Sequence, residues 1–231
     1  MKKIFIIAQI IIIACISINW TQRHRWPPEP PAPTEQELRE SAEKLANCLA
    51  NAAEPSFGTF TDARDGQTYK TVTIDGRTWM AQNLNYKTKR GYWCYENKTN
   101  SCDKYGRLYN WETAKQVCPS GWKLPDSLDW EKLFETACGR EFAGKTLKSK
   151  SGWYDNGNGL DKFGFSALPG GARFHFGSRF YNVGIGGFWW TTTGYYRHMN
   201  TFSDYVVVYE RDNNKHHKSV GYSVRCVTDR P

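Results

Sequence analysis

Residues 186–200, GGFWWTTTGYYRHMN, bring together five aromatic side chains, a histidine and no acidic residue. The run Thr191–Thr193 has β-branched side chains that suit a pleated strand, so we predict that Phe188–Trp190 pack in the core of the domain. Gly194 should end this strand. The residues after it should leave the strand for a surface loop and are candidates for ligand binding: Tyr195, Tyr196, Arg197, His198 and Asn200.

The closing part of the chain supplies a second candidate surface. In YVVVY, residues 205–209, the alternation predicts that Tyr205 and Tyr209 share one strand face with Val207. The polar turn that follows adds side chains able to hydrogen-bond a ligand: Arg211, Asn213, Asn214 and His216. Tyrosines give rigid contact area and the polar groups give directional hydrogen bonds, which is typical of a recognition surface. The alternative is an ordinary solvated hairpin with partly exposed tyrosines.

The rest of the chain predicts an α+β domain with short helices and a glycine-rich antiparallel β meander. TYKTVTIDGRTWMAQNL, residues 68–84, is typical of a hairpin that turns at Asp75-Gly76 in a type I′ turn. We expect short helices at 108–117 and 127–137, the second beginning at Asp126 or Ser127. Capping and the helix dipole account for the carboxylates near that helix start. The second helix should bury Leu128, Trp130, Leu133 and Phe134.

The N-terminus has the pattern of an export signal. Lys2-Lys3 precedes an apolar run, Ile4–Ile18, that is shorter than the roughly 20 residues a membrane-spanning helix needs. We therefore interpret residues 1–18 as a signal peptide. Residues 12–15, IIAC, resemble a bacterial lipobox in which Cys15 would be lipidated, while a plain signal peptide and an uncleaved anchor are the alternatives.

Two segments connect this signal to the domain. Residues 19–33 are rich in proline and predict a stiff, extended tether. Residues 34–52 predict an amphipathic helix, because Thr34 and Glu37 form a capping box ahead of leucines and alanines at helical spacing.

The net charge of the 231-residue chain, +8, favours contact with acidic surfaces such as anionic polysaccharide or phosphate-bearing lipid. Basic residues are scattered along the sequence rather than run together, so we do not expect a nucleic-acid partner.

The chain has seven cysteines, and six remain when Cys15 is set apart. An even number in an exported domain predicts disulfides. Cys94 and Cys102 flank a polar, turn-forming segment, so a bridge between them would close a short loop. Metal binding is the rival interpretation, but no C-x-x-C pair or histidine at ligand spacing supports it.

Seven segments in order resemble the Fibrobacter succinogenes major paralogous domain over residues 57–229. They are TDARDGQTYKTVTIDGRTWMAQNLNY, YGRLYNWETA, CPSGWKLPDSLDW, KSKSGW, FGFSALPGG, FWWTTT and GYSVRCV. The resemblance implies a C-type-lectin-like fold, in the branch that includes formylglycine-generating enzymes, in a family that is mostly exported, often as lipoproteins, and largely without assigned activity. It also implies a Cys118–Cys226 bridge between a helix region and the last strand. Cys48 and Cys138 then pair by elimination.

The resemblance also bears on function, because the candidate residues occupy the place of the ligand-binding face in C-type-lectin-like domains diversified by retroelements. The calcium-binding sugar motifs of C-type lectins do not occur here, and the loop Asp155–Asp161 lacks the acidic twelfth residue of an EF-hand because position 166 is Ser166. The histidines show no metal-ligand spacing. We expect neither metal nor cofactor.

These observations predict a non-catalytic binding module in the bacterial cell envelope, either an outer membrane lipoprotein or secreted. Its partner should be a polysaccharide, another cell-surface glycan or a cell-surface protein, with the membrane reached through the N-terminal anchor. The alternatives are an enzyme like the formylglycine-generating enzymes, which would need a reactive thiol or a metal, and a purely structural surface protein.

Overall fold

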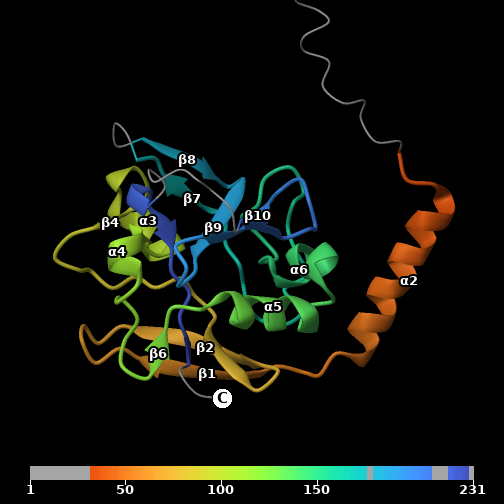
Figure 1. Cartoon of the computed structure of the whole chain (residues 1–231), viewed down its shortest axis with the longest axis horizontal. Helices are drawn as coiled ribbons and strands as arrows, with labels where there is room; N and C mark the ends of the chain where they lie inside the picture. Colours follow the sequence, from red (N-terminus) through yellow and green to blue (C-terminus); the bar gives the residue numbers. More distant parts are fainter. Residues whose placement is uncertain (1–31, 176–178, 210–217, 229–231) are drawn as a thin grey trace, which may run out of the picture. The chain divides into compact units, whose positions relative to one another are not determined.

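A computed structural model describes residues 32–175, 179–209 and 218–228 (Figure 1). The predicted signal peptide with Cys15 and nearly all of the tether lie outside the described residues. So do four of the candidate ligand-binding residues: Arg211, Asn213, Asn214 and His216.

The predicted N-terminal helix forms as α2, Glu35–Asn51. Its capping box is present, since the amide of Thr34 donates to the Glu37 carboxylate at 2.7 Å and the amide of Glu37 donates to the Thr34 hydroxyl at 3.2 Å. The chain divides within this helix into two compact units, Met1–Lys44 and Leu45–Pro231. Among the described residues, no helix is long and apolar enough to cross a membrane.

The second unit contains a five-stranded antiparallel sheet in the order β1-β2-β3-β13-β6. The predicted hairpin is confirmed as β2–β3, with Ile74 opposite Arg77. Asp75 and Gly76 have φ of 48° and 72°, as a type I′ turn requires. The strands are β1 Ser56–Thr61, β2 Thr68–Ile74, β3 Arg77–Met80, β6 Trp122–Lys123 and β13 Val227–Thr228.

A second sheet has the order β11-β10-β9-β12-β5-β4, with β7 paired to β9 and β8 paired to β7. The prediction of an antiparallel meander is only partly right, because β9 pairs in parallel with both β7 and β12. The strands are β4 Tyr92–Trp93, β5 Leu108–Tyr109, β7 Gly170–Arg173, β8 Phe180–Val183, β9 Gly186–Trp190, β10 Tyr196–Asn200, β11 Val207–Tyr209 and β12 Tyr222–Ser223.

Helix α5, Ser127–Thr136, forms where predicted, with Asp126 as its cap. Its predicted buried face is partly wrong: Leu128 is 64% exposed, whereas Asp129 is buried. The other predicted helix shrinks to α4, Trp111–Ala114, because Leu108 and Tyr109 pair with two neighbouring strands as β5. Helices not predicted from the sequence are η1 Tyr95–Asn97, α3 Thr99–Tyr105 and α6 Arg140–Leu147.

The second sheet separates two hydrophobic clusters. Trp189 points into one of them, where α5 packs between the two sheets with Trp79 and Trp130 (Figure 1). Phe188 and Trp190 point into the other. All three aromatic residues of β9 are at most 6% exposed, which confirms that this part of the opening segment belongs to the core.

Three disulfides join the pairs expected from the sequence and the family resemblance: Cys48–Cys138, Cys94–Cys102 and Cys118–Cys226. They account for every cysteine in the described part of the chain. Disulfides persist in oxidising compartments, so the three bridges indicate a location outside the cytoplasm.

Candidate functional site

The candidate residues from Tyr196 to Asn200 form a strand, not the loop predicted from the sequence. Gly194, with φ of 85°, lies in the turn that joins β9 to β10, and the Trp111 ring packs where a side chain at this position would stand. Strand β10 then pairs along its whole length with β9 and also with β11. The hydrogen-bonding edges offered by these two neighbours override the tendency to leave the sheet after a glycine.

Strand alternation divides the candidates in β10 between two faces. Arg197 and Met199 are fully buried on the core side, and Met199 belongs to the cluster around α5. Arg197 therefore does not lie on the predicted surface. Its guanidinium lies 3.9 Å from the Glu131 carboxylate on α5.

The opposite face of β10 carries Tyr196, His198 and Asn200, which are all partly exposed. Tyr196 stands opposite Tyr209 of β11, and their rings stack with centroids 4.5 Å apart and planes at 22°. The His198 ring stacks on Phe188 at 4.3 Å. We call the surface formed by Tyr196, His198, Asn200 and Tyr209 the tyrosine face.

Besides Arg197, two more of the predicted members lie outside this face. Tyr205 lies before the start of β11 and so does not take part in its alternation. The next residue, Val206, is buried, and its amide donates to the Arg140 carbonyl at 2.8 Å. The predicted sharing of one strand face by Tyr205 and Tyr209 is therefore wrong. Tyr195 lies in the β9–β10 turn, where its carbonyl accepts from the amide of Thr191 at 2.9 Å.

The tyrosine face continues into residues that the sequence did not single out. Tyr222 of β12 contacts the Tyr196 ring at 4.7 Å and stacks with Phe188 at 5.3 Å. Because β12 lies next to β9 only through a parallel pairing, no local sequence signal indicates this neighbour. Desolvation raises the pKa of the Tyr222 hydroxyl, which therefore stays protonated.

His198 provides a measurable property of this face. Burial lowers the pKa of its imidazole to about 4, from 6.5. Because the folded pKa is the lower one, the unfolded chain takes up a proton first, and stability should fall as the pH drops from about 6.5 to about 4. We expect His198→Gln to be less sensitive than the native chain to pH in this window, measured by urea unfolding at several pH values. Equal pH dependence of the two proteins would contradict a buried, neutral His198.

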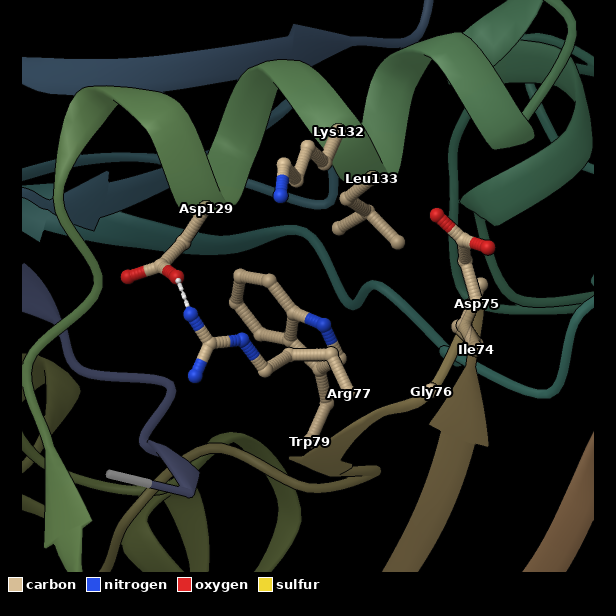
Figure 2. Close-up of a pocket in the computed structure, with 8 residues that line it drawn as sticks. All are labelled: Ile74, Asp75, Gly76, Arg77, Trp79, Asp129, Lys132 and Leu133. Carbon is tan, nitrogen blue, oxygen red and sulfur yellow. Dashed lines mark hydrogen bonds and ion pairs between the residues drawn. The ribbon is translucent and has the colours of Figure 1, made fainter. Parts of the chain in front are cut away.

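A pocket of about 100 Å³ lies between the β2–β3 turn and α5 (Figure 2). Two carboxylates line it, Asp75 at the hairpin turn and Asp129 on α5. Asp129 accepts from Arg77 at 2.9 Å and pairs with Lys123 at 2.8 Å. Asp129 also completes the capping box of α5 with Asp126. These contacts neutralise Asp129 and fix it in place, so Asp126 and Asp129 stabilise the helix start, as the sequence indicated.

No group of three His, Cys, Asp or Glu side chains in the described residues is placed to hold a metal ion. His198 faces Phe188, and His175 lies beside Phe174 near the end of β7.

Comparison with known proteins gives one finding. The family model described as the Fibrobacter succinogenes major domain matches residues 72–228, which contain both sheets except β1 and the start of β2. Searches of the curated proteins and of the solved structures give no match. The match covers most of the chain, and the chain therefore belongs to the Fibrobacter succinogenes major domain family.

Proposed function

We propose that the domain is a non-catalytic binding module that recognises polysaccharide or another cell-surface glycan through the tyrosine face. The observation that carries the proposal is the pair of stacked rings, the partly exposed Tyr196 and the exposed Tyr209, on one side of β10 and β11. Tyr209 lies on β11 at the edge of the sheet and is 39% exposed, so a large aromatic ring is accessible to a ligand.

The chemistry of this face suits a sugar. A tyrosine ring offers a flat apolar surface to the C–H side of a sugar ring and a hydroxyl at its edge. The Asn200 side chain adds polar groups on the same side of the strand, and its Oδ1 already accepts from the Phe202 amide at 2.8 Å. This bond fixes the side chain, which reduces the entropy lost on binding.

The proposal includes a C-type-lectin-like fold and attachment to the cell envelope. The Cys118–Cys226 bridge supports the fold, because it ties the region after α4 to the segment before β13. The three disulfides support export. An N-terminal signal with lipidation at Cys15, followed by the proline-rich tether, would hold the domain at the outer membrane, and cleavage without lipidation would release it.

Loss of the stacked pair should weaken binding. We expect the full chain, purified in a mild detergent, to bind one or more members of a panel of neutral and acidic polysaccharides. Tyr196→Ala/Tyr209→Ala should weaken that binding about tenfold or more, because each ring that stacks on ligand contributes on the order of 1 kcal/mol. Affinity electrophoresis and calorimetry measure the change.

The matched control removes two exposed aromatic rings elsewhere, Tyr154 and Phe202, which are 57% and 75% exposed. Tyr154→Ala/Phe202→Ala should bind as the native chain does. A loss of binding in this control, with Tyr196→Ala/Tyr209→Ala unaffected, would place the ligand elsewhere. No binding to any glycan by the folded, fully oxidised chain would reject glycan recognition.

A further inference from the structure

The segment of residues 86–93 carries three cations within four positions, Lys87, Lys89 and Arg90, and two arginines from elsewhere in the chain lie beside it. Two hollows open along it, of about 270 Å³ and about 360 Å³. Cations line both: Arg64, Lys89 and Arg90 the first, and Lys87 and Arg107 the second. Neither lining contains an aspartate or a glutamate among the described residues.

The five cations divide into two groups. Arg64 is bound to the buried Asp62 through several hydrogen bonds, the shortest at 2.6 Å, and Arg107 donates to the Asn85 carbonyl at 2.9 Å. By contrast, Lys87, Lys89 and Arg90 are exposed. Their charged groups make no hydrogen bond or ion pair with the residues that the structure describes. Three positive charges therefore remain available on one short segment.

The backbone under these three cations is fixed by buried groups. The Asn85 amide donates to the Tyr69 hydroxyl at 3.0 Å, and the Tyr109 hydroxyl donates to the Tyr86 carbonyl at 2.8 Å. At the other end, the Asn110 amide donates to the Gly91 carbonyl at 3.0 Å. A segment held at both ends loses little entropy when it binds, so its charges can act on a ligand at small cost.

Aromatic rings lie at both ends of the segment, and a guanidinium group lies over the ring at each end. Arg64 lies 3.9 Å over the Tyr86 ring, and Arg173 lies 4.1 Å over the Trp93 ring. Such pairs orient both partners and present an apolar and a positive surface together. The ligand class that matches both surfaces carries flat apolar faces and negative charges along its length.

We propose that residues 86–93 bind an acidic polysaccharide, with Lys87, Lys89 and Arg90 contacting its carboxylates. A single small anion fits less well, because the cations line two hollows rather than converge on one point. A nucleic acid would meet the same charges, but the three disulfides indicate a compartment outside the cytoplasm. The site shares no residue with the tyrosine face, and the proposal does not depend on it.

The test uses the full chain in mild detergent with polygalacturonate, a polymer of carboxylated sugars. Its methyl-esterified form keeps the sugar rings and loses the negative charge. The native chain should bind polygalacturonate, with an affinity that falls as salt rises, and should bind the esterified polymer at least tenfold more weakly. Lys87→Ala/Lys89→Ala/Arg90→Ala should lower the affinity for polygalacturonate about tenfold or more.

The matched control removes the same charge from exposed lysines outside the segment, in Lys70→Ala/Lys132→Ala/Lys150→Ala. This variant should keep at least a third of the native affinity. Equal losses in the two triple variants would overturn the proposal, because they would show an effect of net charge alone. Equal thermal unfolding midpoints of both variants and the native chain exclude misfolding.

Two further probes separate the sources of negative charge. Inorganic phosphate should not displace the polymer at comparable charge concentration, and vesicles of phosphatidylcholine with phosphatidylglycerol should bind more weakly than polygalacturonate. Preferential binding to the vesicles would assign the segment to a lipid surface and overturn the polysaccharide proposal. Loss of polygalacturonate binding in Tyr196→Ala/Tyr209→Ala alone would instead support the tyrosine face and reject this segment.

Discussion

Removal of the Cys118–Cys226 disulfide in Cys118→Ala/Cys226→Ala is expected to lower the free energy of unfolding by about 5 kcal/mol. The bridge closes a loop with a sequence separation of 108, and the entropy that a crosslink removes from the unfolded chain grows with loop length. Cys226 is also fully buried among apolar side chains, so its truncation leaves a small cavity. Urea unfolding under non-reducing conditions measures the loss.

Cys94→Ala/Cys102→Ala is the matched comparison, because it removes a bridge with a sequence separation of only 8. The same relation gives about 2–3 kcal/mol for this pair. Ordinary domains are stable by only about 5–15 kcal/mol. Loss of the Cys118–Cys226 bridge should therefore leave much of the chain unfolded at 37 °C, whereas loss of the Cys94–Cys102 bridge should not. Equal losses would show that local strain or packing, and not loop closure, sets the contribution of each bridge.

Replacement of Arg225 by methionine is expected to lower the free energy of unfolding by about 3 kcal/mol. Arg225 is fully buried and donates to the Asn83 side-chain oxygen at 3.1 and 2.9 Å, and also to the carbonyls of Met80 and Phe165. Methionine keeps the apolar contacts but leaves these buried acceptors without a donor, which costs about 1–3 kcal/mol for each unsatisfied group. Part of this cost is offset because a charge is no longer held away from water.

The same network explains why the effect should spread beyond one residue. The Asn83 oxygen that accepts from Arg225 also accepts from the Trp189 indole at 2.9 Å. Lys150→Met, at an exposed position, should change stability by less than about 0.5 kcal/mol in the same denaturation experiment. If Arg225→Met and the native chain have the same urea unfolding midpoint, the cost of burying the charge cancels the gain from its hydrogen bonds.

Local sequence signals predicted the elements whose causes are local. The Thr34–Glu37 capping box, the Asp126 cap and the Asp75-Gly76 turn each depend on contacts within a few residues, and each forms as expected. The prediction of a helix over residues 108–117 was wrong in part, because the helical pattern there competes with strand pairing. Tyr109 lies between β4 and β12, and this sheet contact comes from residues far along the chain.

The candidate site was predicted in part for the same reason. The sequence identified Tyr196 and Tyr209 as surface aromatics, but it could not show that they stack, because their register depends on how β10 and β11 pair. Arg197 was misplaced because strand alternation has meaning only once the strand exists. With β10 inserted between β9 and β11, every second side chain turns into the core, and Arg197 is one of them.

Sequence patterns were enough to predict the family, the α+β class, the hairpin turn and the helix caps, because these follow from ordered motifs and short-range hydrogen bonds. The tertiary structure decided which side of β10 stays open and which buried acceptors surround Arg225. It also decided how residues 86–93 gather cations around two hollows. These properties depend on neighbours distant in the chain, since burial and charge density are set by packing and not by the order of residues.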